Sequence, residues 1–447
     1  MSSQEFYSLF LQFIFPFLGV NFFIFGLFYL VLKRVLPNGV MDPLFIIFVI
    51  GFSTKYTIMC FLYWLGYIKE YYFYLFMLYL ISVLSAYHVL RLSSFDIPNW
   101  YYRSYVNRRV ALRDFEYLAL LVVYFFVSII ILKSIGLGVF ADTNRFENSR
   151  GMGVFVRLID GLTYFLIAYT ALRFFLGRGA RKLVSFLMLA FLVVFSALLN
   201  GAKISFLFNV LAITFVYRIH FKRNLFSLKG VLITVLFGLI FIFFALQENL
   251  KRNGIDPLSN SENIDGVPLV VDKFVHRMVS NGNTVYMLLP NGNIDNIDTD
   301  SFLIRIITPM IGITQMSKLI GYNAGDYSVG RQALLTFNPD AEIAGGPTSH
   351  FDYFSYVYLG PILGFVFILI IGGALGILSR QILNYQRKSE KSLFLSSLLT
   401  AIWFRFCVVM VEPPIGIAYL MDLFLIFGGL FAFRLVALAR RSGSVGI

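Results

Sequence analysis

The 447-residue chain has few charged residues and almost no cysteine. Charged side chains make up 14% of it, and the two cysteines, Cys60 and Cys407, both lie in apolar segments. They form no disulfide framework and match no zinc-binding spacing. The absence of a P-loop argues against ATP hydrolysis, and no cluster of carboxylates is typical of a divalent-metal site. We therefore expect neither a metal nor another cofactor.

Apolar residues dominate instead. Hydrophobic residues make up 58% of the chain and aromatic residues 18%. A water-soluble domain could not bury so much apolar surface, so the composition predicts an all-α polytopic integral membrane protein. No Lys or Arg precedes Lys33, so the basic region of a signal peptide is missing. We expect the first apolar segment to be retained as a helix.

Segments of about 20 apolar residues are long enough to span a bilayer as helices. The chain contains about eleven such segments, at 6–32, 43–66, 71–90, 115–135, 154–174, 183–199, 203–219, 230–247, 355–379, 391–411 and 416–435. These segments divide the chain into three parts: helices 1–8 within residues 1–247, a large polar loop at 248–350, and helices 9–11 within residues 351–447. A loop of that size is too long to be only a connector.

The net charge of +13 indicates orientation rather than nucleic-acid binding. Four connections are basic and nearly free of acidic residues, at 91–114, 173–182, 218–229 and 380–391. Basic connections face the cytoplasm. The large loop and the smaller one at 136–153 are then extracytoplasmic, the N-terminus lies outside, and the C-terminus is cytoplasmic.

The large loop is not uniform. Residues 251–266 are polar and predict irregular structure, whereas 270–288 contain a short periodic stretch typical of an interfacial helix. Residues 301–320 are apolar but contain Arg305 and Pro309. They fit a re-entrant helix, a surface helix or a twelfth span.

Four cations fall in the outer half of the predicted membrane: Lys55, Arg157, Lys203 and Arg405. A charge at such depth is costly unless it faces a cavity or a partner. Because Lys55 has no acidic candidate in its own helix and all four share one leaflet, a common anionic ligand explains the set. A phosphate or pyrophosphate head group fits that position.

Local pairing is the alternative explanation. Asp160 follows Arg157 by three residues, and Asp422 lies at about the depth of Arg405. Either carboxylate could neutralise its neighbour. Lys203 is shallow enough for its amine to reach the interface.

Arginines of the outer loops are further candidates for phosphate binding, because guanidinium groups bind phosphate oxygens in pairs and stay charged. Arg145 and Arg150 flank Glu147 before Gly151-Met152-Gly153 and a predicted helix, whose N-terminus adds partial positive charge. Arg277 lies in the large loop. Each of them could equally be a solvated surface residue.

Three residues are candidates for the base that removes a hydroxyl proton. His350 and Asp352 lie where the large loop meets the next helix, and Glu412 precedes Pro413 in a short outer turn. A histidine or carboxylate at such a place can accept a proton from a sugar hydroxyl. His350 could also be a hydrogen-bonded boundary residue, and Glu412 could hold Arg405.

The chain resembles Wzy-type O-antigen or oligosaccharide repeat-unit polymerases. The resemblance rests on about eleven helices with a large late outer loop, and on two motifs. Leu198-Leu199-Asn200-Gly201-Ala202-Lys203-Ile204-Ser205-Phe206 is similar to a small-residue turn in which a basic residue opens a helix. Gly345-Gly346-Pro347-Thr348-Ser349-His350-Phe351-Asp352-Tyr353, followed by Gly360 and Gly364, is similar to the family's loop-to-helix re-entry.

The resemblance implies a metal-independent membrane glycosyltransferase of the GT-C type in the bacterial inner membrane, with its large loop in the periplasm. Its donor would be a glycan on undecaprenyl pyrophosphate, and its acceptor a lipid-linked repeat unit. Membrane lipids are then partners, and a chain-length regulator protein is a further candidate; nucleic acid is not. In this reading Arg145, Arg150, Arg157, Lys203, Arg277 and Arg405 hold the pyrophosphate. An O-antigen ligase acting on lipid A-core and a flippase of lipid-linked oligosaccharides remain alternatives.

Overall fold

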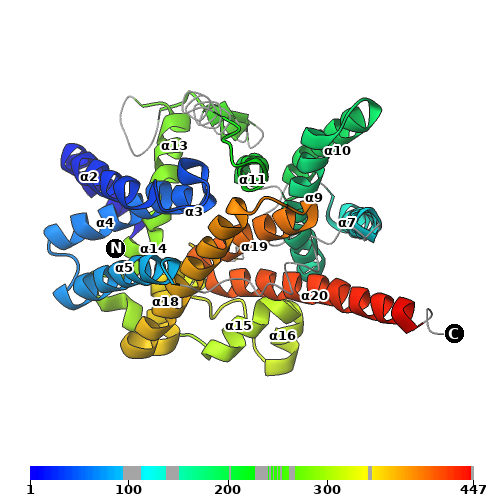
Figure 1. Ribbon diagram of the computed structural model, residues 1–447. Coiled ribbons are helices and arrows are strands. Elements are labelled where there is room, and N and C mark those ends of the chain that lie inside the picture. The colour runs from blue at the N-terminus through cyan, green and yellow to red at the C-terminus, as the bar shows by residue number, and fades with distance from the viewer. Residues whose placement is uncertain are drawn as a thin grey trace. The chain divides into compact units, whose positions relative to one another are not determined.

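The protein is a membrane protein built from helices (Figure 1). The computed structural model describes residues 1–93, 112–136, 151–200, 203–226, 254–260, 267–340 and 345–443, with scattered residues between 240 and 251. Within these ranges the backbone forms helices and one isolated bridge, between Asn260 and Pro268, with no extended strand. This confirms the predicted all-α fold class.

Nine helices of the described residues are long and apolar enough to cross a membrane. They comprise Ile14–Leu32, Pro43–Trp64, Glu70–Arg91, Phe115–Ile135, Gly153–Leu176, Ala180–Leu199, His350–Arg387, Leu393–Val411 and Pro413–Ala432. The predicted segment 203–219 forms α11 (Lys203–Phe221), whose apolar stretch Ser205–Phe221 is slightly shorter. The predicted segment 230–247 lies almost wholly outside the described residues. Nine of the eleven predicted segments thus form helices of spanning length, and a tenth forms the shorter apolar helix in α11.

The first predicted segment, 6–32, is two helices rather than one. α1 (Ser3–Gln12) is capped by Ser2, whose hydroxyl accepts the Glu5 N–H while the Glu5 carboxylate accepts the Ser2 N–H. α2 (Ile14–Leu32) begins after Phe13, with Pro16 in its first turn. Proline lacks an N–H and is tolerated there, where that group has no helical partner. The helix boundary therefore lies just before the proline.

The polar segment 248–350 contains several short helices. α13 (Leu269–Val279) and α14 (Asn283–Leu288) account for the helix predicted at 270–288, with a 3-10 turn at Ser280–Gly282 between them. α17 spans Val329–Leu335. Residues 301–320 form α15 (Phe302–Ile311) and α16 (Ile313–Ile320). Gly312 separates the two helices and has a positive φ of 99°. Neither approaches the roughly 20 residues that one span requires, so this stretch is not a single straight transmembrane helix.

Contacts group the chain into two compact units, each drawn from several stretches of sequence. Unit 1 comprises Met1–Ser94, Lys222–Phe302 and Tyr322–Arg380. Unit 2 comprises Phe95–Phe221, Leu303–Gly321 and Gln381–Ile447. Both units therefore combine parts from before, within and after the polar segment.

In unit 1, the long helix α18 (His350–Arg387) breaks at Gly360, where φ is 70° and ψ is −178°. Pro361 follows immediately. The hydroxyl of Tyr79 in α5 (Glu70–Arg91) donates to the Pro361 carbonyl at 2.8 Å. This contact ties α5 to α18 at the break.

Unit 1 also contains a very close approach of two backbone segments. A Cβ on Gly330, in the first turn of α17, would lie 1.8 Å from the Pro347 carbonyl oxygen. A Cβ on Gly346 would lie 2.1 Å from the Gly330 carbonyl oxygen. Only glycine fits at either position, so these residues fix how residues 345–347 enter α18.

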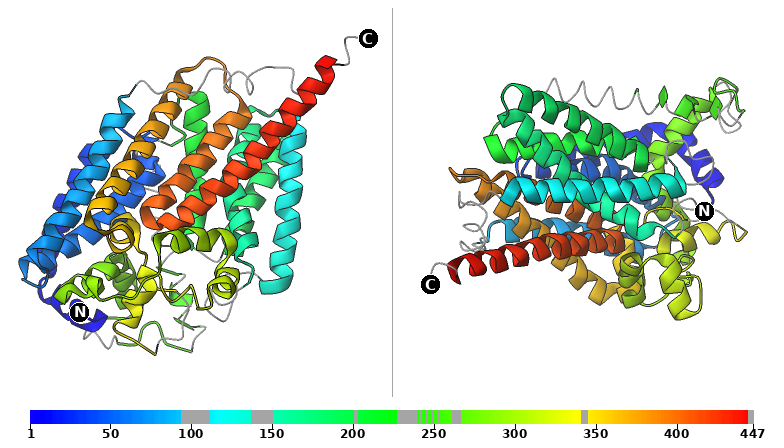
Figure 2. Two further views of the ribbon diagram at one scale, coloured as in Figure 1. Left: turned by 90° about the horizontal axis from the view of Figure 1, so that it is seen from below. Right: turned by 90° about the vertical axis from the view of Figure 1, so that its right-hand side faces the viewer.

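Unit 2 is organised around α9 (Gly153–Leu176). This helix contacts α7 (Leu112–Ile135), α10 (Ala180–Asn200), α11, α19 (Leu393–Val411) and α20 (Pro413–Gly443). Figure 2 shows α9, α19 and α20 running beside one another. Gly416 permits the close contact of α20 with α19, because a Cβ there would lie 2.5 Å from the Val409 nitrogen. The central position of α9 explains why most of its side chains are buried.

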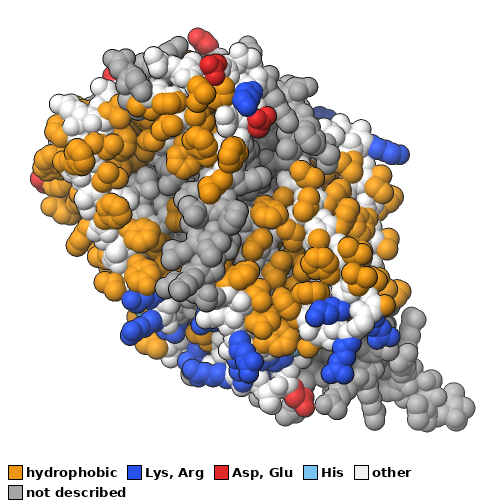
Figure 3. Space-filling model, turned by 90° about the horizontal axis from the view of Figure 1, so that it is seen from above, with side chains coloured by type: hydrophobic (Ala, Val, Ile, Leu, Met, Phe, Trp, Pro, Cys, Tyr) orange, Lys and Arg blue, Asp and Glu red, His pale blue; other side chains and the backbone are white. Residues whose placement is uncertain are grey.

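Large apolar side chains cover the outer helical faces of both units, as Figure 3 shows for one side of the molecule. Phe22 of α2 and Leu183 of α10 are 71% and 60% exposed. In this view most Lys and Arg side chains gather along one edge of the apolar surface rather than among the apolar side chains. Such surfaces are suited to lipid contact, with the charges in the interface.

The glycine contact in unit 1 gives the first prediction. Gly330→Ala and Gly346→Ala should each destabilise the protein by about 1–3 kcal/mol, because the added methyl group has no space beside the opposing carbonyl. Gly26→Ala, in α2, is the matched control, because no atom lies within 4 Å of its Cβ position. Thermal unfolding in detergent measures the effect. Equal midpoints for all three variants would contradict the close approach.

Candidate functional site

A cluster of arginines, tyrosines and carboxylates lies in unit 2, where α9 begins, α19 ends and α20 begins. We call it the arginine–tyrosine cluster. It consists of Arg157, Asp160 and Tyr164 from α9, Arg405 from α19, and Tyr419 and Asp422 from α20. The spacings of three and four residues place the members of each helix on one face. Arg405 lies about 9 Å along α19 from its end at Val411.

Arg157 forms a bidentate ion pair with Asp422. Its Nε lies 2.5 Å from Asp422 Oδ2, and its Nη2 lies 3.1 Å from Oδ1. Nη2 also donates to the Met310 carbonyl of α15 at 3.0 Å. The alternative pairing of Arg157 with Asp160, three residues later, is therefore wrong. Asp160 instead accepts a hydrogen bond from the Tyr419 hydroxyl at 3.0 Å.

Arg405 is held by aromatic rings. Its guanidinium carbon lies 4.3 Å from the ring centroids of both Tyr164 and Tyr419, and the residue is 6% exposed. Across the described part of the chain Arg405 forms no ion pair, so its expected pairing with Asp422 is also wrong. Cation–π contacts stabilise a desolvated guanidinium, but they leave its N–H donors unused.

Two guanidinium nitrogens of the cluster are buried without a hydrogen-bond partner among the described residues. They are Nε of Arg405 and Nη1 of Arg157. Arginine N–H groups seldom remain unsatisfied in a protein interior, because each such loss is costly. The arrangement can therefore accept an anion, whose oxygens would satisfy these donors.

A third arginine lies on the helix that contacts Arg157. Arg305 of α15 is 6% exposed, five residues before the Met310 carbonyl that binds Arg157. α15 thus contributes both a backbone acceptor and a buried cation to unit 2. Sequence spacing gave no sign that 301–320 contacts the start of α9.

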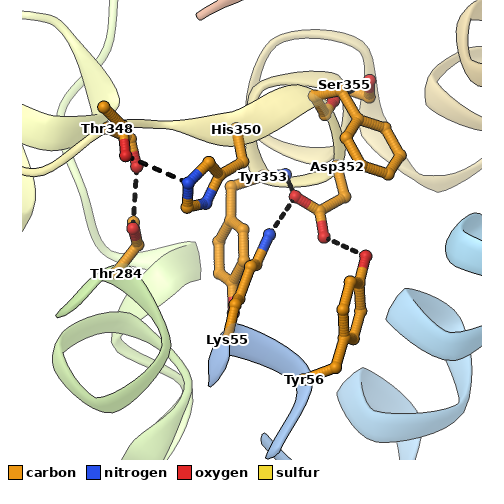
Figure 4. Close-up of polar contacts among 9 residues, drawn as sticks. Lys55, Tyr56, Thr284, Thr348, His350, Asp352, Tyr353 and Ser355 are labelled. Atoms are coloured by element: carbon orange, nitrogen blue, oxygen red, sulfur yellow. Dashed lines mark hydrogen bonds and ion pairs between the residues drawn. The ribbon is translucent and has the colours of Figure 1, made fainter. Parts of the chain in front are cut away.

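A second buried polar cluster lies in unit 1 (Figure 4). Lys55, in the α4 segment (Ser53–Trp64), forms an ion pair with Asp352 in the first turn of α18. The Tyr56 hydroxyl donates to Asp352 Oδ2 at 2.8 Å, and the Tyr353 N–H donates to Oδ1 at 3.0 Å. We call this the lysine–aspartate cluster. Lys55 therefore has its own acid, which reduces the need for a shared anionic ligand at that position.

His350 lies beside this pair and opens α18 with a φ of 53°. Its Nε2 is 3.0 Å from the Thr348 hydroxyl, and the Thr348 carbonyl accepts from the Thr284 hydroxyl at 2.8 Å. The ring packs edge-on against Phe52 at 5.3 Å between centroids. Its Nδ1 has no hydrogen-bond partner in the described ranges.

The lysine–aspartate cluster is closed to solvent. Lys55 and Asp352 are both 0% exposed, and His350 is 3% exposed. Asp352 already accepts three hydrogen bonds, which leaves little capacity for a substrate hydroxyl in this conformation. The cluster ties α4 to the start of α18, and it thereby sets where the polar segment enters the helix.

The remaining predicted site residues are dispersed. Arg277 is exposed on α13 in unit 1. Glu412 follows the last residue of α19, in the turn to α20, and is half-buried. Arg145, Arg150 and the side chain of Lys203 lie outside the described residues. Of the nine candidates, the structure groups Arg157 with Arg405, and His350 with Asp352.

The sequence analysis did not single out Asp295, which binds two tyrosines. Its Oδ1 accepts from the Tyr356 hydroxyl of α18 at 2.7 Å, and Oδ2 accepts from the Tyr72 hydroxyl of α5. Asp295 itself is exposed. It follows Asn291 and Gly292, which have positive φ values of 60° and 72°. The Asn-Gly signal predicts this turn, but no local pattern predicts the two tyrosines.

Comparisons with protein-family models, curated proteins and solved structures gave no match to this chain. The described ranges contain no group of three or more His, Cys, Asp or Glu side chains arranged to hold a metal ion. The chemistry must therefore be inferred from the clusters themselves.

The buried ion pair of unit 1 gives the second prediction. Lys55→Met or Asp352→Leu alone should destabilise the protein by about 3–5 kcal/mol, because each leaves the opposite charge buried without its partner. The double variant should lose less than either single one. Unfolding midpoints in detergent, with exposed Lys251→Met as the control, measure this. Additive losses in the double variant would show that the two side chains do not interact.

Proposed function

We propose that the protein is a membrane glycosyltransferase that polymerises oligosaccharide repeat units carried on a lipid pyrophosphate. The hydroxyl of one lipid-linked unit would attack the anomeric carbon of a growing glycan on undecaprenyl pyrophosphate. The lipid pyrophosphate would then leave. The proposal includes eleven spans, with 230–247 crossing the membrane, and a large loop on the outer side of the bacterial inner membrane.

The observation that supports this proposal is the pair of unsatisfied guanidinium donors in the arginine–tyrosine cluster. Arg405 Nε and Arg157 Nη1 are buried in unit 2 on neighbouring helices. Asp422 forms an ion pair with Arg157, whereas Arg405 contacts two tyrosine rings and has no ion pair among the described residues. A phosphate group supplies both the negative charge and the acceptor oxygens that these nitrogens lack.

The same features suit a departing pyrophosphate. Negative charge grows on the leaving group as the glycosidic bond breaks, and fixed donors that meet this charge lower the barrier. Tyr164 and Tyr419 both contact the Arg405 guanidinium with their rings, and Tyr419 is itself held by Asp160. The donors are therefore oriented before the substrate arrives, and no metal ion is needed for this role.

The acceptor hydroxyl must also lose a proton. His350, Asp352 and Glu412 remain candidates, but the first two would need the lysine–aspartate cluster to open. Asp295 is an additional candidate, because its carboxylate is exposed and oriented by Tyr72 and Tyr356. We propose Asp295 as the fourth residue to test.

The third prediction concerns Arg405. Arg405→Lys should lower polymerisation by roughly 100-fold or more, because an ammonium group loses the planar donor pattern of the guanidinium. The assay is chain growth on a lipid-linked repeat unit by purified protein in liposomes. Arg178→Lys is the matched control, since Arg178 is exposed near the start of α10.

Three outcomes of this assay bear on the proposal. Normal activity of Arg405→Lys would remove Arg405 from the pyrophosphate site. A strict need for lipid A-core would favour the ligase over the polymerase. Failure of the unaltered protein to join any glycan, while it moves the lipid-linked unit between leaflets, would contradict the enzyme and favour the flippase.

A further inference from the structure

Helix α15 turns apolar side chains outward and polar side chains inward. Its outward positions are apolar and four residues apart: Leu303, Ile307 and Ile311 are 67%, 37% and 38% exposed. Its inward positions are polar, because Arg305 is 6% and Thr308 is 1% exposed. A helix on a water-facing surface shows the opposite pattern, with its apolar stripe turned inward.

α16 continues the exposed surface with a mixed character. Ile313 and Leu319 are 53% and 72% exposed, and the neighbouring polar residues Thr314, Gln315 and Lys318 are exposed as well. A helix that presents apolar and polar side chains outward in this way fits a boundary between hydrocarbon and water.

The position of the two helices relative to α9 supports the same conclusion. A Cβ on Gly312, between α15 and α16, would lie 3.8 Å from a methyl carbon of Val154 in the first turn of α9. Val154 and Phe155 are themselves 43% and 38% exposed. The apolar edge of α15 therefore continues the apolar surface of a membrane-spanning helix at its end.

We propose that α15 and α16 are interfacial helices that lie in the lipid surface, with Leu303, Ile307 and Ile311 in the acyl region. Lipid is the occupant because the apolar face is continuous with a spanning helix and because both helices are too short to cross. α15 also positions the arginine–tyrosine cluster, since the Met310 carbonyl holds Arg157 at 3.0 Å. This inference does not depend on the proposed catalytic activity.

The test uses spin labels in liposomes of phosphatidylethanolamine and phosphatidylglycerol. Leu303→Cys, Ile307→Cys and Ile311→Cys are each labelled in the full-length Cys60→Ala/Cys407→Ala protein. Collisions with oxygen, which concentrates in lipid, are compared with collisions with a water-soluble nickel chelate. Lys318→Cys and Thr314→Cys are the controls on the polar side.

The proposal predicts that oxygen collisions exceed nickel collisions at residues 303, 307 and 311, with the order reversed at 314 and 318. Nickel access equal to or above oxygen access at the three apolar positions would place the face in water and overturn the proposal. Low access to both reagents there would show that protein covers the face, which also overturns it. All five labels lie on exposed positions, so the variants should fold, and gel filtration checks this.

Discussion

Ionised side chains inside a membrane bundle need partners within the protein, because hydrocarbon supplies neither counter-charge nor water. Lys55 meets Asp352 in unit 1, and Arg157 meets Asp422 in unit 2. Each pair joins helices that lie far apart in the sequence. The cost of isolating a charge therefore helps to decide which helices pack together, and it fixes the entry of α18 and the junction of α9 with α20.

Arg405 meets this constraint differently. The centroids of two tyrosine rings lie 4.3 Å from its guanidinium carbon, and no described carboxylate forms an ion pair with it. Aromatic faces offset part of the desolvation cost but accept no strong hydrogen bond from Nε. The result is a buried cation with an unsatisfied Nε, for which we propose an anionic ligand. This distinction, rather than the number of basic residues, is what makes the arginine–tyrosine cluster the better candidate for a pyrophosphate site.

Local sequence patterns predicted the helices well and the contacts between them poorly. Apolar runs of about 20 residues predicted nine described helices that are long and apolar enough to span a membrane, because membrane thickness directly limits helix length. Spacing along one helix suggested Asp160 as the partner of Arg157, but α20 supplies Asp422. That pairing depends on how α9 packs against α20, which no local pattern reveals. For the same reason the sequence offered no partner for Lys55, whose acid lies in another helix of unit 1.

The most direct measurement of the central claim is the position of a lipid pyrophosphate in an experimental structure of the protein in lipid nanodiscs. The account predicts phosphate oxygens about 2.7–3.2 Å from Arg405 Nε or Arg157 Nη1, beside Tyr164 and Tyr419. A pyrophosphate bound elsewhere, with both of these nitrogens still lacking an anionic partner, would contradict it.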